Sequence, residues 1–266
     1  MRKKESAQSN AKIAFIFFIF LFLIVGISSI FKVVIIIREG QFDSSRRFTF
    51  TVANNEKVHV VSHSAGSNSL IIFQMNGKTS SDRAGQLLGI PIDGFISAKD
   101  SGENLEASSF LLKSIIGYSN LQTNLTIVDL IKLYFSVKAV PENFVTIREI
   151  SLEEDMAKID KIVGRLVFDE LIEKEGKTIQ IINGTDVGGL GSRLARLVTN
   201  AGGNVILVAT ADSPKKKSII AYTGKKTYTV EKLEKVLKYE IIENRENAIS
   251  DITITIGEDK LNSLFF

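Results

Sequence analysis

The chain has 266 residues, enough for two modest domains, and its 33 basic and 30 acidic side chains give a net charge of +3. Four of the basic residues and one acid fall within the first twelve positions, so the rest of the chain is neutral overall. A neutral body excludes the broad basic surface that nucleic-acid binding needs. The lack of cysteine excludes disulfides, thiolate metal sites and a cysteine nucleophile.

The first predicted element is a transmembrane helix at residues 13–31, a run of nineteen uncharged residues. At about 1.5 Å per residue this run spans roughly 28 Å, close to the thickness of the hydrocarbon core of a bilayer. Because residues 1–12 are basic, the positive-inside rule predicts a cytoplasmic tip, a single pass through the cell membrane and an exported body. The alternative is a cleaved signal peptide, with an apolar core at 13–25 and a poor small-x-small cleavage site at Gly26-Ile27-Ser28. Both alternatives place the body outside the cytoplasm.

Residues 46–150 alternate between strand and helix patterns, which predicts an α/β layer domain. The expected strands are a half-buried one at 48–53, a hairpin of 58–63 with 70–75, and two more at 90–97 and 144–150. One helix should run from Ser81 or Asp82 to Leu88 and a second should cover 110–116. A third should open at Thr126, with Asp129 completing a capping box.

The sequence VVSHSAG, with Ser64 as its second serine, resembles the strand–turn–helix elbow that carries a hydrolase nucleophile. The elbow requires a histidine later in the chain, and none follows His63. His59 and His63 share one face of a predicted strand about 13 Å apart, which is too far for one metal ion. The pattern therefore argues against both a hydrolase and a histidine metal site.

Residues 151–177 are expected to form a connecting helix, opened by a capping box of Ser151 and Glu154 and ended by Gly176. After it, strand patterns at 178–183, 204–210, 218–223 and 251–256 surround helices at 190–201 and from Thr229 onward. The order β-α-β-β-α-β predicts a small ferredoxin-like domain at 178–266. The fold class is thus α/β (α+β) throughout the exported part.

A glycine-rich turn, NGTDVGGLG, separates the first strand and helix of this last domain. The third glycine of a dinucleotide-binding fingerprint is replaced by Leu194, and Thr210 stands where that fold needs an acid. Either the turn is only a tight strand-to-helix connection, or it binds an anion at an open helix N-terminus. The candidate ligand-binding residues are the turn residues Asn183, Gly184, Thr185, Gly188 and Gly189 and the basic loop Lys215, Lys216 and Lys217.

The stretch IQIINGTDVGGLGSRLARLVTNAGGNV resembles the LytR C-terminal domain, which reads strand, N-G-[ST], three variable residues, G-[LA]-A, and a helix with spaced leucines. The matching residues are Asn183, Gly184, Thr185, Gly189, Leu190, Leu194, Leu197 and Gly202. Gly191 replaces the usual alanine. The resemblance implies a cell-envelope setting for residues 178–266.

The stretch LLGIPIDGFIS (87–97) resembles the LytR-CpsA-Psr (LCP) domain, which implies that residues 46–150 share its fold. In that family an acid and an Arg-Asp pair hold Mg²⁺ and a polyprenyl pyrophosphate, from which a glycan is transferred to peptidoglycan. Glu56 retains the first acid and Thr79 the motif threonine. Gly77 and Lys78 stand at the Arg-Asp pair and Asn54 at a further arginine. The resemblance thus implies the fold without a catalytic set, leaving Glu56, Lys78 and Thr79 as remnants.

The sequence therefore predicts a membrane-anchored envelope protein with a non-catalytic binding or scaffolding role in cell-wall assembly, without a cofactor. Its expected partners are the membrane and either cell-wall glycan or another envelope protein, and nucleic acid is not among them. The alternative is a divergent LCP-type phosphotransferase that uses Mg²⁺. Transcription regulation, suggested only by the name of the family, lacks a helix-turn-helix pattern and a basic face.

Overall fold

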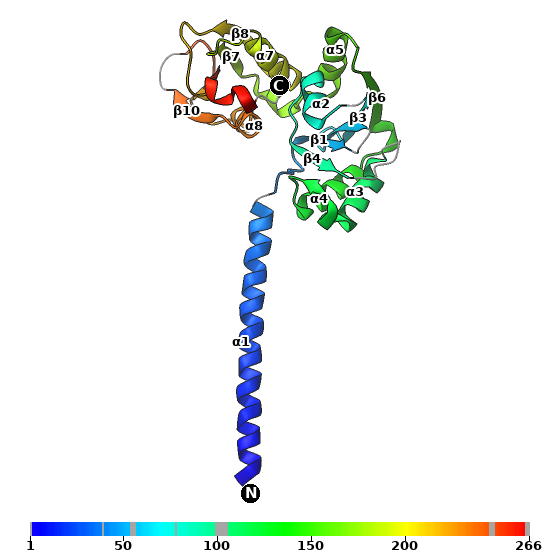
Figure 1. Ribbon diagram of the computed structural model, residues 1–266, viewed down its shortest axis with the longest axis vertical. Helices are drawn as coiled ribbons and strands as arrows, with labels where there is room; N and C mark the ends of the chain where they lie inside the picture. Colours follow the sequence, from blue (N-terminus) through cyan, green and yellow to red (C-terminus); the bar gives the residue numbers. More distant parts are fainter. Residues whose placement is uncertain are drawn as a thin grey trace. The chain divides into compact units, whose positions relative to one another are not determined.

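The computed structural model describes residues 2–38, 40–53, 57–77, 79–98, 106–244 and 248–263. The chain divides into two units, Met1–Gly40 and Gln41–Phe266. The first unit contains the helix α1, Arg2–Arg38 (Figure 1). Its segment Phe15–Lys32 has a mean hydropathy of 2.5, and none of its residues is buried. By length and composition this helix can cross a membrane, as a signal sequence also can.

The second unit begins with a six-stranded sheet in the order β5-β4-β1-β2-β3-β6. Helices cover both of its faces, giving the three layers of an α/β fold (Figure 1). We call this part, with its helices, the middle lobe. Its strands are β1 Arg47–Ala53, β2 Val58–Ser64, β3 Ser69–Asn76, β4 Gly94–Ser97, β5 Gln122–Thr123 and β6 Val145–Ser151. Its helices are α2 Ser81–Leu88, α3 Ala107–Ile116, α4 Ile127–Lys138 and α5 Met156–Leu166, with 3₁₀ turns at Tyr118–Asn120 and Glu142–Phe144.

Side chains alternate across the central strands and fill two separate cores. Phe48, Phe50 and Val52 of β1 face α3 and α4, whereas Val60 of β2 and Phe73 of β3 face α2 and α5. The expected strand at 48–53 is consequently buried on both faces rather than half-buried. The predicted hairpin is confirmed, because β2 and β3 pair in antiparallel register.

Helix starts show where local patterns succeed and where they fail. The capping box of Thr126 and Asp129 is present at the start of α4. The predicted box at Ser151 is wrong, because Ser151 extends β6 opposite Asn76 and Asp155 caps α5 instead. The single connecting helix expected over 151–177 is two helices, α5 and α6 (Glu170–Glu175), and the latter ends at Gly176 as predicted.

The C-terminal lobe is a five-stranded sheet in the order β10-β9-β11-β7-β8. Both long helices pack on one face of it, and their apolar residues join the isoleucines of β7, β9 and β11 in a single core. Its strands are β7 Thr178–Asn183, β8 Asn204–Thr210, β9 Ile219–Thr223, β10 Glu240–Asn244 and β11 Ile252–Ile256. Its helices are α7 Leu190–Asn200 and α8 Tyr228–Leu237, followed by a 3₁₀ helix at Glu258–Ser263.

The mixed α/β class is confirmed, with one strand more than the sequence predicts in the last lobe. β10 pairs in parallel with β9, and β7 pairs in parallel with β8. A ferredoxin-like sheet is therefore the wrong topology, since its order would not place these successive strands side by side. The helix expected to open at Thr229 begins at Tyr228, and Thr227 occupies its N-cap position without a side-chain capping bond.

All three apolar cores lie in the unit Gln41–Phe266, and α1 contributes to none of the described clusters. Burial of apolar surface is the main force that stabilises a fold. The second unit thus contains the interactions needed to fold without α1, and residues 40–266 are a suitable fragment for measurements in solution.

Candidate functional site

The glycine turn after β7 is held by its own side chains. The Asn183 Oδ1 atom accepts hydrogen bonds from the Thr185 backbone N–H (3.2 Å) and hydroxyl (2.8 Å), and Asn183 Nδ2 donates to the Val187 carbonyl (2.9 Å). The Val187 N–H in turn bonds to the Thr185 hydroxyl. Asn183 and Thr185 are both buried. These two predicted ligand-binding residues therefore fix the turn and have little capacity left for a ligand.

The structure brings the basic loop against this turn. Because β7 and β8 are parallel neighbours, their C-terminal ends lie at the same sheet edge, and the loop after β8 passes the turn after β7. The Lys215 N–H donates to the Gly184 carbonyl at 2.7 Å. A Cβ atom at Gly184 would lie 2.6 Å from Lys215 Cγ, so the close approach requires glycine.

The remaining predicted residues are accessible. Gly188 and Gly189 are exposed with open space around them, and Gly189 adopts φ +82° as the N-cap of α7. Lys216 is exposed, and the ammonium of Lys217 forms a solvent-exposed ion pair with Glu240 at 3.2 Å. The edge thus offers backbone N–H groups at an uncapped helix start together with lysine charge. Asp186 and Asp212, both exposed, accompany them.

Of the three remnant LCP positions, only Thr79 lies among the described residues. Glu56 and Lys78 lie outside the described residues, as does Asn54. Thr79 is half-buried, and its hydroxyl is buried without a hydrogen-bond partner among the described residues. The described part of the chain contains no group of three His, Asp or Glu residues placed to hold a metal ion.

His59, His63 and Ser64 are all residues of the strand β2, and all three are buried. His63 contacts the Ser69 carbonyl through Nδ1 (3.1 Å) and the Ser136 hydroxyl through Nε2 (2.6 Å). Burial, followed by a smaller effect of Arg47, keeps the pKa of His63 below its usual value despite the Ser69 bond. Ser64 is the last residue of β2 and not part of a strand-to-helix elbow.

A second arrangement, which sequence patterns do not reveal, is the joint between the two lobes. Arg196 of α7 donates to Asp160 Oδ1 (2.7 Å) and to the carbonyls of Gln86 (2.9 Å) and Leu87 (2.5 Å) at the end of α2. Asn200, one turn later on α7, donates to the Leu88 carbonyl and to Asp160.

On its other side the joint is formed by α8. The Lys232 ammonium lies 2.6 Å from Asp93 Oδ1 and 3.2 Å from the Arg47 carbonyl. The Tyr228 hydroxyl donates to Asp169 at 2.6 Å, and burial together with this bond raises the pKa of Tyr228. Charged and polar groups thus hold the lobes in one orientation.

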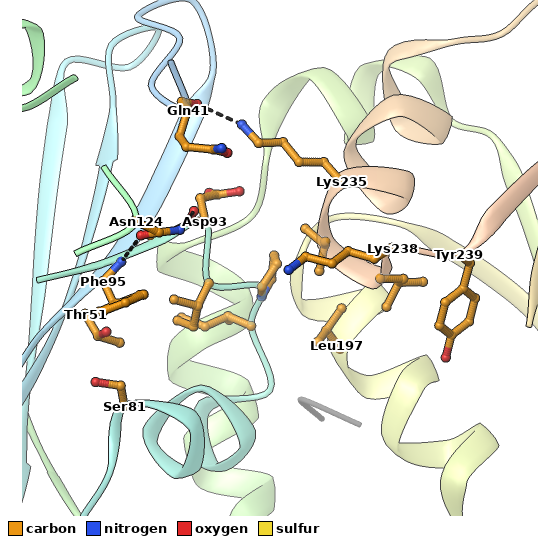
Figure 2. Close-up of a pocket in the computed structure, with 16 residues that line it drawn as sticks. Gln41, Thr51, Ser81, Asp93, Phe95, Asn124, Leu197, Lys235, Lys238 and Tyr239 are labelled. Carbon is orange, nitrogen blue, oxygen red and sulfur yellow. Dashed lines mark hydrogen bonds between the residues drawn. The ribbon is translucent and has the colours of Figure 1, made fainter. Parts of the chain in front are cut away.

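Between these two sets of contacts lies a cavity of about 640 Å³, the interlobe cavity (Figure 2). The middle lobe contributes the segment 90–95, Thr51, Ser81 and Asn124 as well as Gln41. The C-terminal lobe contributes Leu197 and the end of α8 with residues 235–239. The walls come from seven separate segments, and one of them, 90–95, lies within the stretch LLGIPIDGFIS.

One comparison with known proteins bears on the last lobe. Residues 177–259 match the family described as LytR cell envelope-related transcriptional attenuator. This chain segment therefore carries a domain of cell-envelope-related proteins, as its sequence predicts. No curated protein matches the chain.

Two solved structures from Listeria are similar in part. One is Lmo1026 of Listeria monocytogenes, named as a candidate transcriptional factor. It shares 11% identity over 46% of this chain and 94% of its own, with a TM-score of 0.31. The other is the Lin1025 protein of Listeria innocua, at 9% identity over 46% of this chain and 97% of its own, with a TM-score of 0.32.

Proposed function

We propose that the protein is a membrane-anchored component of the cell envelope whose exported part binds, without catalysis, an envelope polymer or protein during cell-wall assembly. The observation that carries the proposal is the envelope-related domain at 177–259, on a chain that begins with a helix of membrane-spanning length. The exposed edge of this domain supports a binding role. It presents backbone donors at Gly188 and Gly189 and the lysines 215–217, a set suited to anionic groups.

Binding can be measured by co-sedimentation of residues 40–266 with purified peptidoglycan that either carries or lacks its anionic polymers. We expect retention on the anionic material, and at least a threefold decrease when Lys215, Lys216 and Lys217 are replaced by alanine. A matched control replaces the exposed Lys158, Lys161 and Lys174 of the connecting helices. Equal retention of both triple variants would show that the basic loop is not the binding surface.

The anchor has its own test, in protoplasts that make the full chain. A protease added outside should digest the chain beyond about residue 40 while the tip stays with the membrane, because the basic residues precede the apolar run. Protection of the C-terminal lobe would reject the proposed topology. Release of a soluble form shortened by about 28 residues would indicate signal cleavage instead.

A divergent LCP-type transferase is the second candidate, favoured by the buried hydroxyl of Thr79 at the motif threonine, which has no hydrogen-bond partner in the described part of the chain. The residues present do not fit Mg²⁺ and a pyrophosphate, because Gly77 and Lys78 replace the pair that would provide a guanidinium and a carboxylate. We expect no transfer from a polyprenyl-pyrophosphate glycan with Mg²⁺. Turnover that Glu56→Ala abolishes would establish the transferase and refute the non-catalytic role.

A further inference from the structure

The interlobe cavity has the size and lining of a small-molecule site. Its volume of about 640 Å³ falls within the range of about 300–1,000 Å³ that is usual for ligand pockets. Apolar side chains from both lobes, among them Ile90, Ile92, Leu197 and Val236, share its wall with a few polar groups. Sites of this composition bind the apolar part of a ligand and orient it through a small number of polar contacts.

The charges in the lining do not balance. Asp93 is the one acid among the residues that line the cavity, and both of its oxygens are engaged, by the Lys232 ammonium (2.6 Å) and the Thr49 N–H (2.9 Å). Two lysines also line it. Among the described residues, the Lys235 ammonium donates to the neutral Gln41 carbonyl at 2.8 Å, and burial lowers its pKa against the opposing effect of Asp93. The cavity therefore carries excess positive charge.

Lys238 is the second of these lysines, and its backbone is unusual. It is the C-cap of α8 at φ +54° and ψ +38°, the left-handed conformation that normally selects glycine. Figure 2 shows its side chain reaching into the space between the lobes. Among the described residues, no hydrogen bond or ion pair engages its ammonium. A lysine in this backbone conformation costs free energy that glycine would not.

We propose that the interlobe cavity binds a small amphipathic anion, whose carboxylate or phosphate contacts Lys238 and Lys235 and whose apolar part packs against Ile90, Ile92 and Leu197. Thr51, which lines the same cavity, has a buried hydroxyl without a partner among the described residues. This site shares no residue with the glycine turn, so it can be tested independently of the polymer binding proposed above. A ligand here would contact both lobes at once.

The test is a calorimetric titration of residues 40–266 with octyl phosphate and with octanoate, both below their micelle concentrations. 1-Octanol serves as the neutral analogue. We expect at least one anion to bind at least tenfold more tightly than the alcohol, and the tighter of the two identifies the headgroup. Octanol that binds as tightly as both anions, or no binding of either anion, would overturn the proposal.

Three variants locate the charge. Lys238→Gln should weaken anion binding about tenfold, the usual effect of losing one charge-assisted contact. Lys238→Gly should weaken it as much while raising the thermal midpoint, because glycine accepts the left-handed backbone. A merely structural lysine would not combine these two effects. Lys225→Gln, an exposed lysine in the turn before α8, is the control. Unchanged affinity in both Lys238 variants would refute the site.

Discussion

Arg196 should be the largest single contributor to the contact between the lobes, and replacing it by methionine tests this. Its guanidinium makes three hydrogen bonds across the joint, to Asp160 and to the carbonyls of Gln86 and Leu87. The side chain is 19% exposed and that of Asp160 is 32% exposed, so water competes only partly. Methionine keeps the apolar stem but none of the donors.

The expected loss follows from these contacts. A hydrogen bond from a charged group contributes about 1.5–3 kcal/mol when buried, and partial exposure reduces the ion pair to about 1 kcal/mol or less. Allowing for water that replaces the lost donors, we expect Arg196→Met to lower the free energy of unfolding by about 3 kcal/mol. Arg196→Lys should cost about half as much, because an ammonium cannot reach all three acceptors.

The measurement is urea unfolding of residues 40–266, followed by far-UV circular dichroism and by tyrosine fluorescence. The control is Arg193→Met, an exposed arginine one turn earlier on α7. A decrease below about 0.5 kcal/mol, the usual range for surface substitutions, or equal effects of the two methionine variants, would show that the polar joint does not stabilise the unit.

Other substitutions probe separate features. Asp129→Asn should lower the free energy of unfolding by about 2–4 kcal/mol, because the fully buried carboxylate accepts from the N–H groups of Gln41, Phe42 and Thr126. Chemical denaturation of the variant and the parent measures this difference. Gly89→Ala should cost more than Gly224→Ala, since both have positive φ but only at Gly89 would a Cβ meet Arg196, at 2.9 Å from Cζ; the midpoints of the two variants would be compared. Burial holds the pKa of His59 below its usual value of 6.5, with Lys57 adding to the effect, so the unfolded chain takes up the proton first and the free energy of unfolding declines as the pH falls below about 6.5. His59→Leu should remove that part of the decline, seen by comparing unfolding at pH 5 and pH 8, and a slope unchanged from the parent would contradict this assignment.

The elements that the sequence predicts well are those with a local signal. The stripe of Leu190, Leu194 and Leu197 on α7 and the alternation in β7 both depend on neighbouring residues, and both are buried as expected. The sequence analysis does not predict β10, because EIIEN follows shortly after α8 and its two glutamates are as compatible with a helix as with a strand. Its partner β9 lies about twenty residues away, and only pairing decides between the two.

The candidate sites likewise include one part that the sequence could predict and one that it could not. That Lys215 meets the glycine turn follows from parallel pairing of β7 and β8, which the order of elements allows but does not require. The joint between the lobes could not be predicted, because Arg196 finds two of its acceptors, the carbonyls of Gln86 and Leu87, about 110 positions earlier in the chain. A free backbone carbonyl at a helix end can belong to any residue type, so the sequence does not show which residues will accept such a bond.

The carboxylate of Glu175 lies just before the last lobe and affects where a fragment containing that lobe should begin. It accepts from the N–H groups of Tyr228 and Thr229 and from the Thr229 hydroxyl, so the last residue of α6 serves as the cap of α8. The family match begins two residues later, at 177. A segment excised at that boundary would leave the first turn of α8 without its acceptor, and we expect that turn to fray. The segment that matches the family therefore begins after a residue that α8 needs, and a fragment intended to keep the first turn of α8 must include Glu175 or supply another acid in its place.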